Sequence, residues 1–174
     1  MSTTRLLLPF QHGVDQVAIE QAVRLAKGCN ATLLSLSVLQ VQAGRKMKGP
    51  RLEVVQQSKD FLEATKHLAR VWCTPIELME VVAHDVGQSI GTVASEMQCD
   101  GIVLFLSGEN CVLLANETIQ YLMEAAGCKL YIMRMSSKAN ISAMKSLRHA
   151  LARVFNKKLV EMPSSGYGVA RAER

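Results

Sequence analysis

Several features that would assign this 174-residue chain to a broad class of proteins are missing from its sequence. No run of about 18 apolar residues occurs, which is the length that a transmembrane helix needs. The apolar stretch after Arg5 ends at Pro9 and is too short for the core of a signal peptide, so we expect a cytoplasmic protein. Aromatic residues make up only 5% of the chain, but a hydrophobic fraction of 49% excludes wholesale disorder.

Motifs for metal binding, redox chemistry and catalysis are also missing. The five cysteines are odd in number and their smallest spacing, between Cys99 and Cys111, is 12 residues, so there is no Cys-x-x-Cys pair. The four histidines show no ligand spacing. We predict no metal site and no cofactor, and we interpret the cysteines as small apolar core residues in a reducing compartment. No Gly-x-Ser-x-Gly nucleophile motif occurs, so we expect a protein that is not an enzyme, with a hydrolase as a weaker alternative.

Strand and helix patterns alternate over residues 1–135, which we predict to be one domain. Short apolar runs indicate buried strands, and longer segments with helical spacing of apolar residues indicate helices. We expect Asp15 and Asp85 to cap helices and Asp100 to lie in a turn. The pattern predicts a doubly wound α/β fold, a five-stranded parallel sheet with helices on both faces. The expected strands are 5–10, 31–38, 76–82, 102–106 and 130–133, and the expected helices are about 15–27, 52–72, 86–97 and 118–126.

Positive charge is concentrated in residues 136–174. This segment has eight Lys or Arg and two Glu, a balance of +6, whereas residues 1–135 have twelve Lys or Arg and thirteen Asp or Glu, a balance of −1. We predict a basic C-terminal extension with an amphipathic helix over about 141–160 and a flexible end. The helix could dock on its own domain or a partner subunit, on an anionic membrane surface, or on a protein partner. We expect no nucleic-acid binding, because the charge does not continue onto the domain.

Three segments of the predicted domain resemble, in their order along the chain, segments of a known protein family. They are the apolar run Arg5–Phe10, the strand start Cys99–Leu104 and the closing strand Leu130–Arg134. Together with the segment Ala31–Leu36, they make residues 4 to 135 resemble the universal stress protein family. The resemblance implies the α/β fold, a role in regulation or stress response, and a homodimer through the last strand. The edge residues of that strand are Leu130, Tyr131, Ile132 and Met133.

The chain departs from the ATP-binding members of this family at the residues that hold the nucleotide. Those members carry an Asp at the end of the first strand, where this chain has Gln11. They also carry a glycine-rich loop after the fourth strand that ends in Gly followed by Ser or Thr. The matching loop here is shorter, keeps Gly108, and has Cys111 and the pair Asn116-Glu117 in place of the other glycines and the hydroxyl residue. The chain therefore resembles a degenerate member of the family.

The missing glycines matter because they let backbone N–H groups approach phosphate oxygens at a helix N-terminus. Acidic side chains in the same loop would repel phosphates and satisfy the helix dipole themselves. We predict a site filled from within and no ATP binding of the family type, hence a non-enzymatic regulatory or interaction protein. The alternative is a nucleotide or small-ligand sensor with a modified pocket where the sheet connections reverse direction. The candidate pocket residues are Phe10, Gln11, His12, Val38, Ser107, Gly108, Glu109, Asn116 and Glu117.

Overall fold

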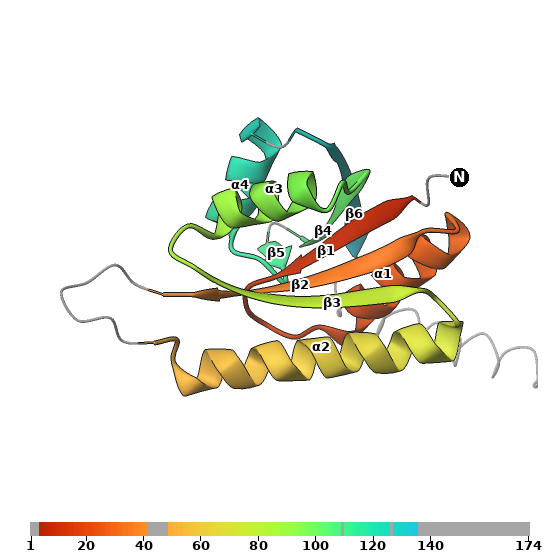
Figure 1. Ribbon diagram of the computed structural model, residues 1–174, viewed down its shortest axis with the longest axis horizontal. Helices are drawn as coiled ribbons and strands as arrows, with labels where there is room; N and C mark the ends of the chain where they lie inside the picture. The colour runs from red at the N-terminus through yellow and green to blue at the C-terminus, as the bar shows by residue number, and fades with distance from the viewer. Residues whose placement is uncertain (1–3, 42–48, 109, 126, 136–174) are drawn as a thin grey trace, which may run out of the picture. The chain divides into compact units, whose positions relative to one another are not determined.

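The computed structural model describes residues 4–41, 49–108, 110–125 and 127–135 (Figure 1). These residues belong to one compact unit, Met1–Met135. The predicted extension over 136–174, with its helix over about 141–160, lies outside the described residues. None of the helices that the structure describes is long and apolar enough to cross a membrane.

The described elements alternate along the chain as the sequence patterns predict. All four helices lie where they were expected, although α4 begins two residues earlier than its predicted start. In chain order the elements are β1 (Arg5–Phe10), α1 (Gln16–Gly28), β2 (Thr32–Gln40), α2 (Leu52–Trp72), β3 (Ile76–Ala83), α3 (Val86–Glu96), β4 (Gly101–Ser107), β5 (Asn110–Val112), α4 (Asn116–Ala125) and β6 (Lys129–Met135).

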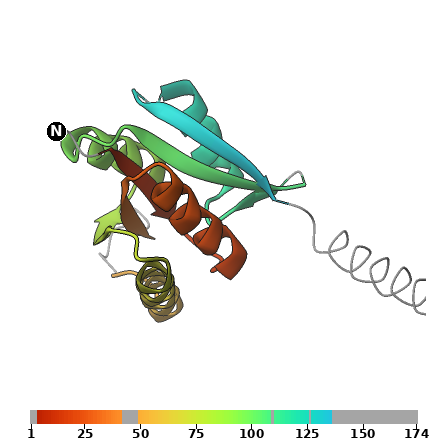
Figure 2. The same ribbon diagram turned by 90° about the vertical axis from the view of Figure 1, so that its right-hand side faces the viewer.

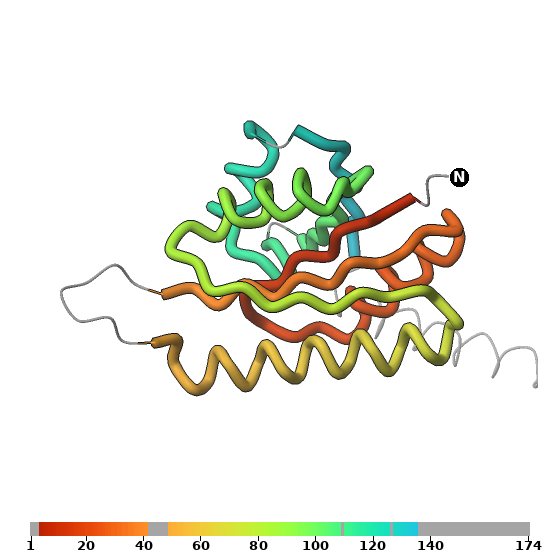
Figure 3. The backbone as a smooth tube through the Cα atoms, in the orientation of Figure 1, coloured from red at the N-terminus to blue at the C-terminus, as the bar shows by residue number. Residues whose placement is uncertain are grey.

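The sheet has five parallel strands in the order β3-β2-β1-β4-β6, which confirms the predicted fold class. Strands β2 and β3 run side by side over eight paired positions (Figure 3). The short strand β5 is an addition that the sequence patterns did not predict, and it pairs antiparallel with the end of β4. It follows a tight turn at Gly108, whose φ of 65° suits glycine. Three residues are too few for an alternating pattern to show.

The helices cover both faces of the sheet, and each pair closes its own core (Figures 1 and 2). Leu6, Leu8 and Phe10 of β1 pack with residues of α1 and α2, including Phe61. The intervening Leu7 packs in the second core with residues of α3 and α4. This alternation along one strand is the geometric result of the two-residue period of a β-strand.

Polar side chains fix the ends of the helices and the start of β4. As predicted, Asp15 caps α1, accepting from the backbone N–H groups of Val17 and Ala18 at 2.9 and 3.0 Å, and Asp85 caps α3 through Gln88 at 2.9 Å. Asp100, expected in a turn, lies just before β4 and does more than turn the chain, because its Oδ2 accepts the backbone N–H of Arg5 at 2.7 Å.

The cysteines are distributed differently from the prediction that all five are core residues. Only Cys99 is buried, at 7% exposure, while Cys29 and Cys73 are exposed and Cys111 and Cys128 are half-buried. The prediction was wrong for Cys29 and Cys73 because both follow helices, at C-cap positions outside the apolar stripe.

The pKa of Cys99 is raised to about 11, mainly by burial. Burial also raises the pKa of Cys128. The positive charge of Arg5 acts in the opposite direction on the pKa of Cys99, and the charge of a Cys128 thiolate raises it further.

Candidate functional site

The candidate site lies where β1 and β4 separate, at the carboxyl ends of these strands. The two strands are neighbours in the sheet, but they pair only at Leu6 with Gly101 and Leu7 with Ile102. The chain leaves β1 toward β2 on one side and leaves β4 toward β6 on the other. A reversal of this kind forms the crevice in which ligands of doubly wound proteins bind.

The crevice is occupied by the chain itself. Strand β5 pairs with the last three residues of β4, and Leu113 directly after it accepts from the backbone N–H groups of Gln11 at 2.8 Å and His12 at 3.3 Å. Leu113 and Leu114 are each 2% exposed, and their side chains enter the two different cores. Backbone and apolar side chains thus fill the space between the ends of β1 and β4.

Gln11 connects the end of β1 to the N-terminus of α4. Its Oε1 accepts from the backbone N–H of Ala115 and from Oγ1 of Thr118, both at 3.1 Å, while its Nε2 donates to Oε1 of Gln40 at 3.1 Å. A helix N-terminus presents backbone N–H groups that attract anions. In this chain, the amide oxygen of Gln11 takes the place of such an anion.

Asn116 and Cys111 close the loop between β5 and α4. Oδ1 of Asn116 accepts the backbone N–H of Cys111 at 3.0 Å, a bond that a glycine at position 116 could not make because it has no side-chain acceptor. Burial raises the pKa of the Cys111 thiol, so that this thiol is neutral near pH 7. Glu117 lies exposed in the first turn of α4 and adds negative charge where a phosphate would approach.

The structure gathers some of the predicted pocket residues and separates others. Gln11 and Asn116 lie in the network at α4, and His12 is joined to it through Leu113. Two other predicted residues lie in the cores: Phe10 stacks on Phe61 with ring centroids 4.4 Å apart, and Val38 is buried in the other core, because alternate strand residues point to opposite faces. Ser107 and Gly108 belong to the β4–β5 turn, Glu117 is exposed, and Glu109 lies outside the described residues.

Sequence reasoning missed four residues of the network: Gln40, Leu113, Ala115 and Thr118. Leu113 has a φ of 73°, which is unusual for a branched residue, and no sequence pattern predicts this conformation. Ala115 takes part through its backbone, so its side chain carries no signal. Thr118 was visible only as the expected start of the last helix.

Comparisons with known proteins bear on the fold of this chain. No protein-family model matches it, and no curated protein matches it. Solved structures do match, among them a universal stress protein from Archaeoglobus fulgidus, with 14% identity, a TM-score of 0.59, and coverage of 74% of this chain and 92% of that one. The chain has the universal stress protein fold.

Two further structures with this fold show similar coverage. A universal stress protein from Lactobacillus plantarum is 19% identical with a TM-score of 0.57, covering 77% of this chain and 99% of its own. Another, solved in complex with cAMP, is 18% identical with a TM-score of 0.56, covering 77% of this chain and 98% of its own. At such identities, the universal stress protein fold is what these comparisons establish.

The network predicts that Gln11 contributes to stability through the groups it satisfies. Replacing Gln11 with Leu removes the acceptor of the Ala115 N–H and the Thr118 hydroxyl, and we expect the free energy of unfolding to fall by about 1–3 kcal/mol. Urea denaturation of the two proteins would measure this difference. The control is Gln40→Ala, which removes only the exposed end of the network and should cost less than about 0.5 kcal/mol. Equal decreases in the free energy of unfolding for the two variants would show that Gln11 does not stabilise the N-terminus of α4.

Proposed function

We propose that this protein is a degenerate universal stress protein that regulates through interaction and does not bind ATP in the family manner. The observation that carries the proposal is the contact of Gln11 Oε1 with the Ala115 N–H at the N-terminus of α4. A nucleotide phosphate would have to displace this oxygen. It would also have to enter a crevice that Leu113 and Leu114 fill, next to the exposed carboxylate of Glu117.

The same geometry favours a binding role over a catalytic one. The side chain of Gln11 is already hydrogen-bonded to the amide of Gln40, the hydroxyl of Thr118 and the backbone N–H of Ala115. The neighbouring titratable side chain of His12 is exposed and is not among the groups bonded to Gln11. General-base and nucleophilic catalysis need a titratable or activated group within reach of a substrate. We therefore propose a protein that is not an enzyme.

A second candidate function is a nucleotide sensor with a modified site. It is favoured by the neighbours of this fold that were solved with nucleotides, namely with cAMP, with dAMP and with AMP. A ligand of this kind would enter the present chain only if the β5–α4 loop moved away from Gln11. Nucleotide titration of the full chain separates the two functions.

We expect calorimetric titration with Mg-ATP, AMP and cAMP to give no binding tighter than the millimolar range. The reason is that the anion position at α4 is occupied by Gln11. A micromolar dissociation constant would contradict the proposed function and favour the sensor. In that case Gln11→Ala should change the affinity, whereas Gln98→Ala at the opposite end of the sheet should leave it unchanged.

We also propose that the domain forms a homodimer through β6. Among the strands that the structure describes, β6 pairs with β4 alone, so its other edge presents free backbone N–H and C=O groups. Two large apolar side chains lie exposed along it, Tyr131 at 36% and Ile132 at 46%. Bare edges with exposed apolar residues are sites of association between chains.

The homodimer predicts the outcome of light scattering at roughly tens of micromolar protein. We expect a dimer for the unmodified chain and a monomer for Ile132→Lys, because the lysine would place a charge in the interface. The control is Val82→Lys on β3, the opposite edge of the sheet, where the valine is 59% exposed. That variant should remain dimeric. A monomeric unmodified chain, or equal behaviour of the two variants, would exclude an interface at β6.

The basic extension supplies a second proposed interaction element. Its charge balance of +6 over residues 136–174 and the predicted apolar stripe suit an anionic membrane surface or a protein partner. We therefore propose that the extension acts separately from the stability of the domain.

Deletion after Ser137 tests this separation. We expect the shortened protein to melt within about 2 °C of the full chain, and to lose binding to vesicles that contain anionic lipid or to a protein partner. Vesicles of neutral lipid, and anionic vesicles at high salt, are the controls for charge. If the shortened protein melts far lower or becomes insoluble, the extension is part of the fold. Several buried Leu or Phe side chains, worth about 1.5–3 kcal/mol each, would then have been lost.

A further inference from the structure

A pair of cysteines lines one cavity at the amino ends of the strands, far from Gln11 in the sheet. Cys99 lies just before β4 and Cys128 just before β6, and these two strands start side by side, with Gly101 paired to Lys129. Both cysteines line the same cavity of about 170 Å³, which also touches the C-terminal half of α3. Because these cysteines are 29 residues apart in the chain, no spacing motif reveals the pair.

The cavity exists because α3 and α4 pack closely at one turn and leave space at the next. A Cβ added at Gly87 would meet Cδ1 of Tyr121 at 2.5 Å, whereas a Cβ at Gly91, one turn later, would meet no atom within 4 Å. The cavity shares Gly91 and Gly127 with a wider groove of about 470 Å³. Exposed residues such as Thr92 line that groove, so the cavity of the two cysteines adjoins a groove that faces solvent.

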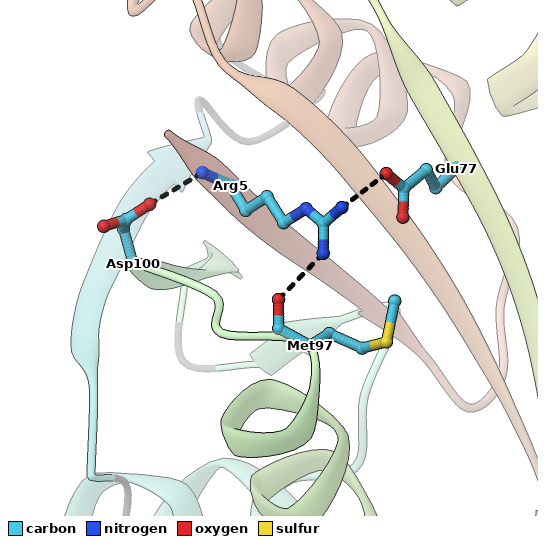
Figure 4. A network of polar contacts seen from close by, with 4 residues as sticks. All are labelled: Arg5, Glu77, Met97 and Asp100. Carbon is cyan, nitrogen blue, oxygen red and sulfur yellow. Dashed lines mark hydrogen bonds and ion pairs between the residues drawn. The ribbon is translucent and has the colours of Figure 1, made fainter. Parts of the chain in front are cut away.

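Hydrogen bonds hold the chain on both sides of Cys99 (Figure 4). The guanidinium of Arg5 donates to the backbone carbonyl of Met97 at 3.0 Å, and it also pairs with Glu77 at 2.9 Å. The backbone N–H of Arg5 donates to the carboxylate of Asp100, and the Asp100 N–H donates back to the Arg5 carbonyl at 2.8 Å. The backbone on both sides of Cys99 is therefore held in place before any ligand arrives, which favours binding.

The number and kind of available ligands limit what the cavity can hold. Among the residues that the structure describes, no group of three or more His, Cys, Asp or Glu side chains could hold a metal ion. An ion that needs four protein ligands, such as structural Zn²⁺, is not served by two sulfurs. Thiolates are soft ligands that select soft ions, and a monovalent d¹⁰ ion accepts two of them.

We propose that Cys99 and Cys128 form a two-thiolate site for a soft monovalent metal ion of the Cu(I) class. Two sulfur–metal bonds form, the two S–H bonds break, and both protons pass to solvent. The ion keeps its oxidation state, so no oxidant or reductant takes part. The site is independent of the proposed function, since it lies at the other end of the sheet from Gln11.

The test uses the full chain with Cys29, Cys73 and Cys111 replaced by Ser, so that only the proposed pair of thiols remains. Cu(I) is supplied without oxygen, in competition with a colorimetric Cu(I) chelator. We expect one ion per chain, an ultraviolet thiolate-to-metal absorption band, and protection of both thiols from a thiol reagent. Adding Cys99→Ser or Cys128→Ser should each weaken binding by about 100-fold or more and remove the band.

The half-buried Cys128 provides a variant that is expected to fold, should the buried Cys99→Ser fail to do so. Its circular dichroism spectrum is compared with that of the parent. Cu(I) affinity that survives Cys128→Ser unchanged would overturn the proposal, because a single thiol with methionine ligands would then suffice. Equally tight binding by the protein that lacks both thiols would assign the ion to the methionines and would overturn it as well.

Discussion

The N-terminus of α4 sets the constraint on which the candidate site depends. A helix N-terminus has backbone N–H groups without partners inside the helix, and they must be satisfied by a side chain, by water or by a ligand. In this protein, Oε1 of Gln11 satisfies the N–H of Ala115 and the hydroxyl of Thr118 together. Because one neutral side chain bridges β1 and α4, the loop between β5 and α4 lies against the sheet, and Leu113 and Leu114 can be buried.

The filled crevice is a local feature within a fold that other proteins share. The five parallel strands and the two helix layers are those of universal stress proteins, which were solved with several nucleotides. At the carboxyl ends of β1 and β4, this chain has the short antiparallel strand β5 and an asparagine that accepts the backbone N–H of Cys111. Function in such folds resides in the site and not in the scaffold.

At the opposite end of the sheet, where the strands begin, Arg5 holds several segments together. There Arg5 joins β1 to β3 and to the chain around Cys99, with one ion pair and three further hydrogen bonds through its side chain and backbone. This anchoring gives the amino ends of the strands a fixed geometry, and the open turn at Gly91 leaves a cavity beside it. The two outer strands β3 and β6 leave both edges of the described sheet free, which makes association through an edge a property of the architecture.

The sequence by itself determined the elements and the fold class. Continuous apolar runs such as the one in β1, helical spacing in α1, and the caps Asp15 and Asp85 are local signals, because each depends on residues that are close in the chain. The departure at Gln11 was also visible, because the resemblance to ATP-binding universal stress proteins implies an Asp at that place.

Only the tertiary structure decided which groups fill the crevice. The partners of Gln11 are about a hundred residues away in sequence, and Ala115 contributes through a backbone atom that has no sequence signature. Tertiary structure also decided the positions of Phe10 and Val38, whose side chains point to opposite faces of the sheet and lie in different cores. In the same way, strand pairing places Cys99 and Cys128 beside one cavity. Contacts between distant segments depend on register and crossover direction, and those are properties of the assembled sheet.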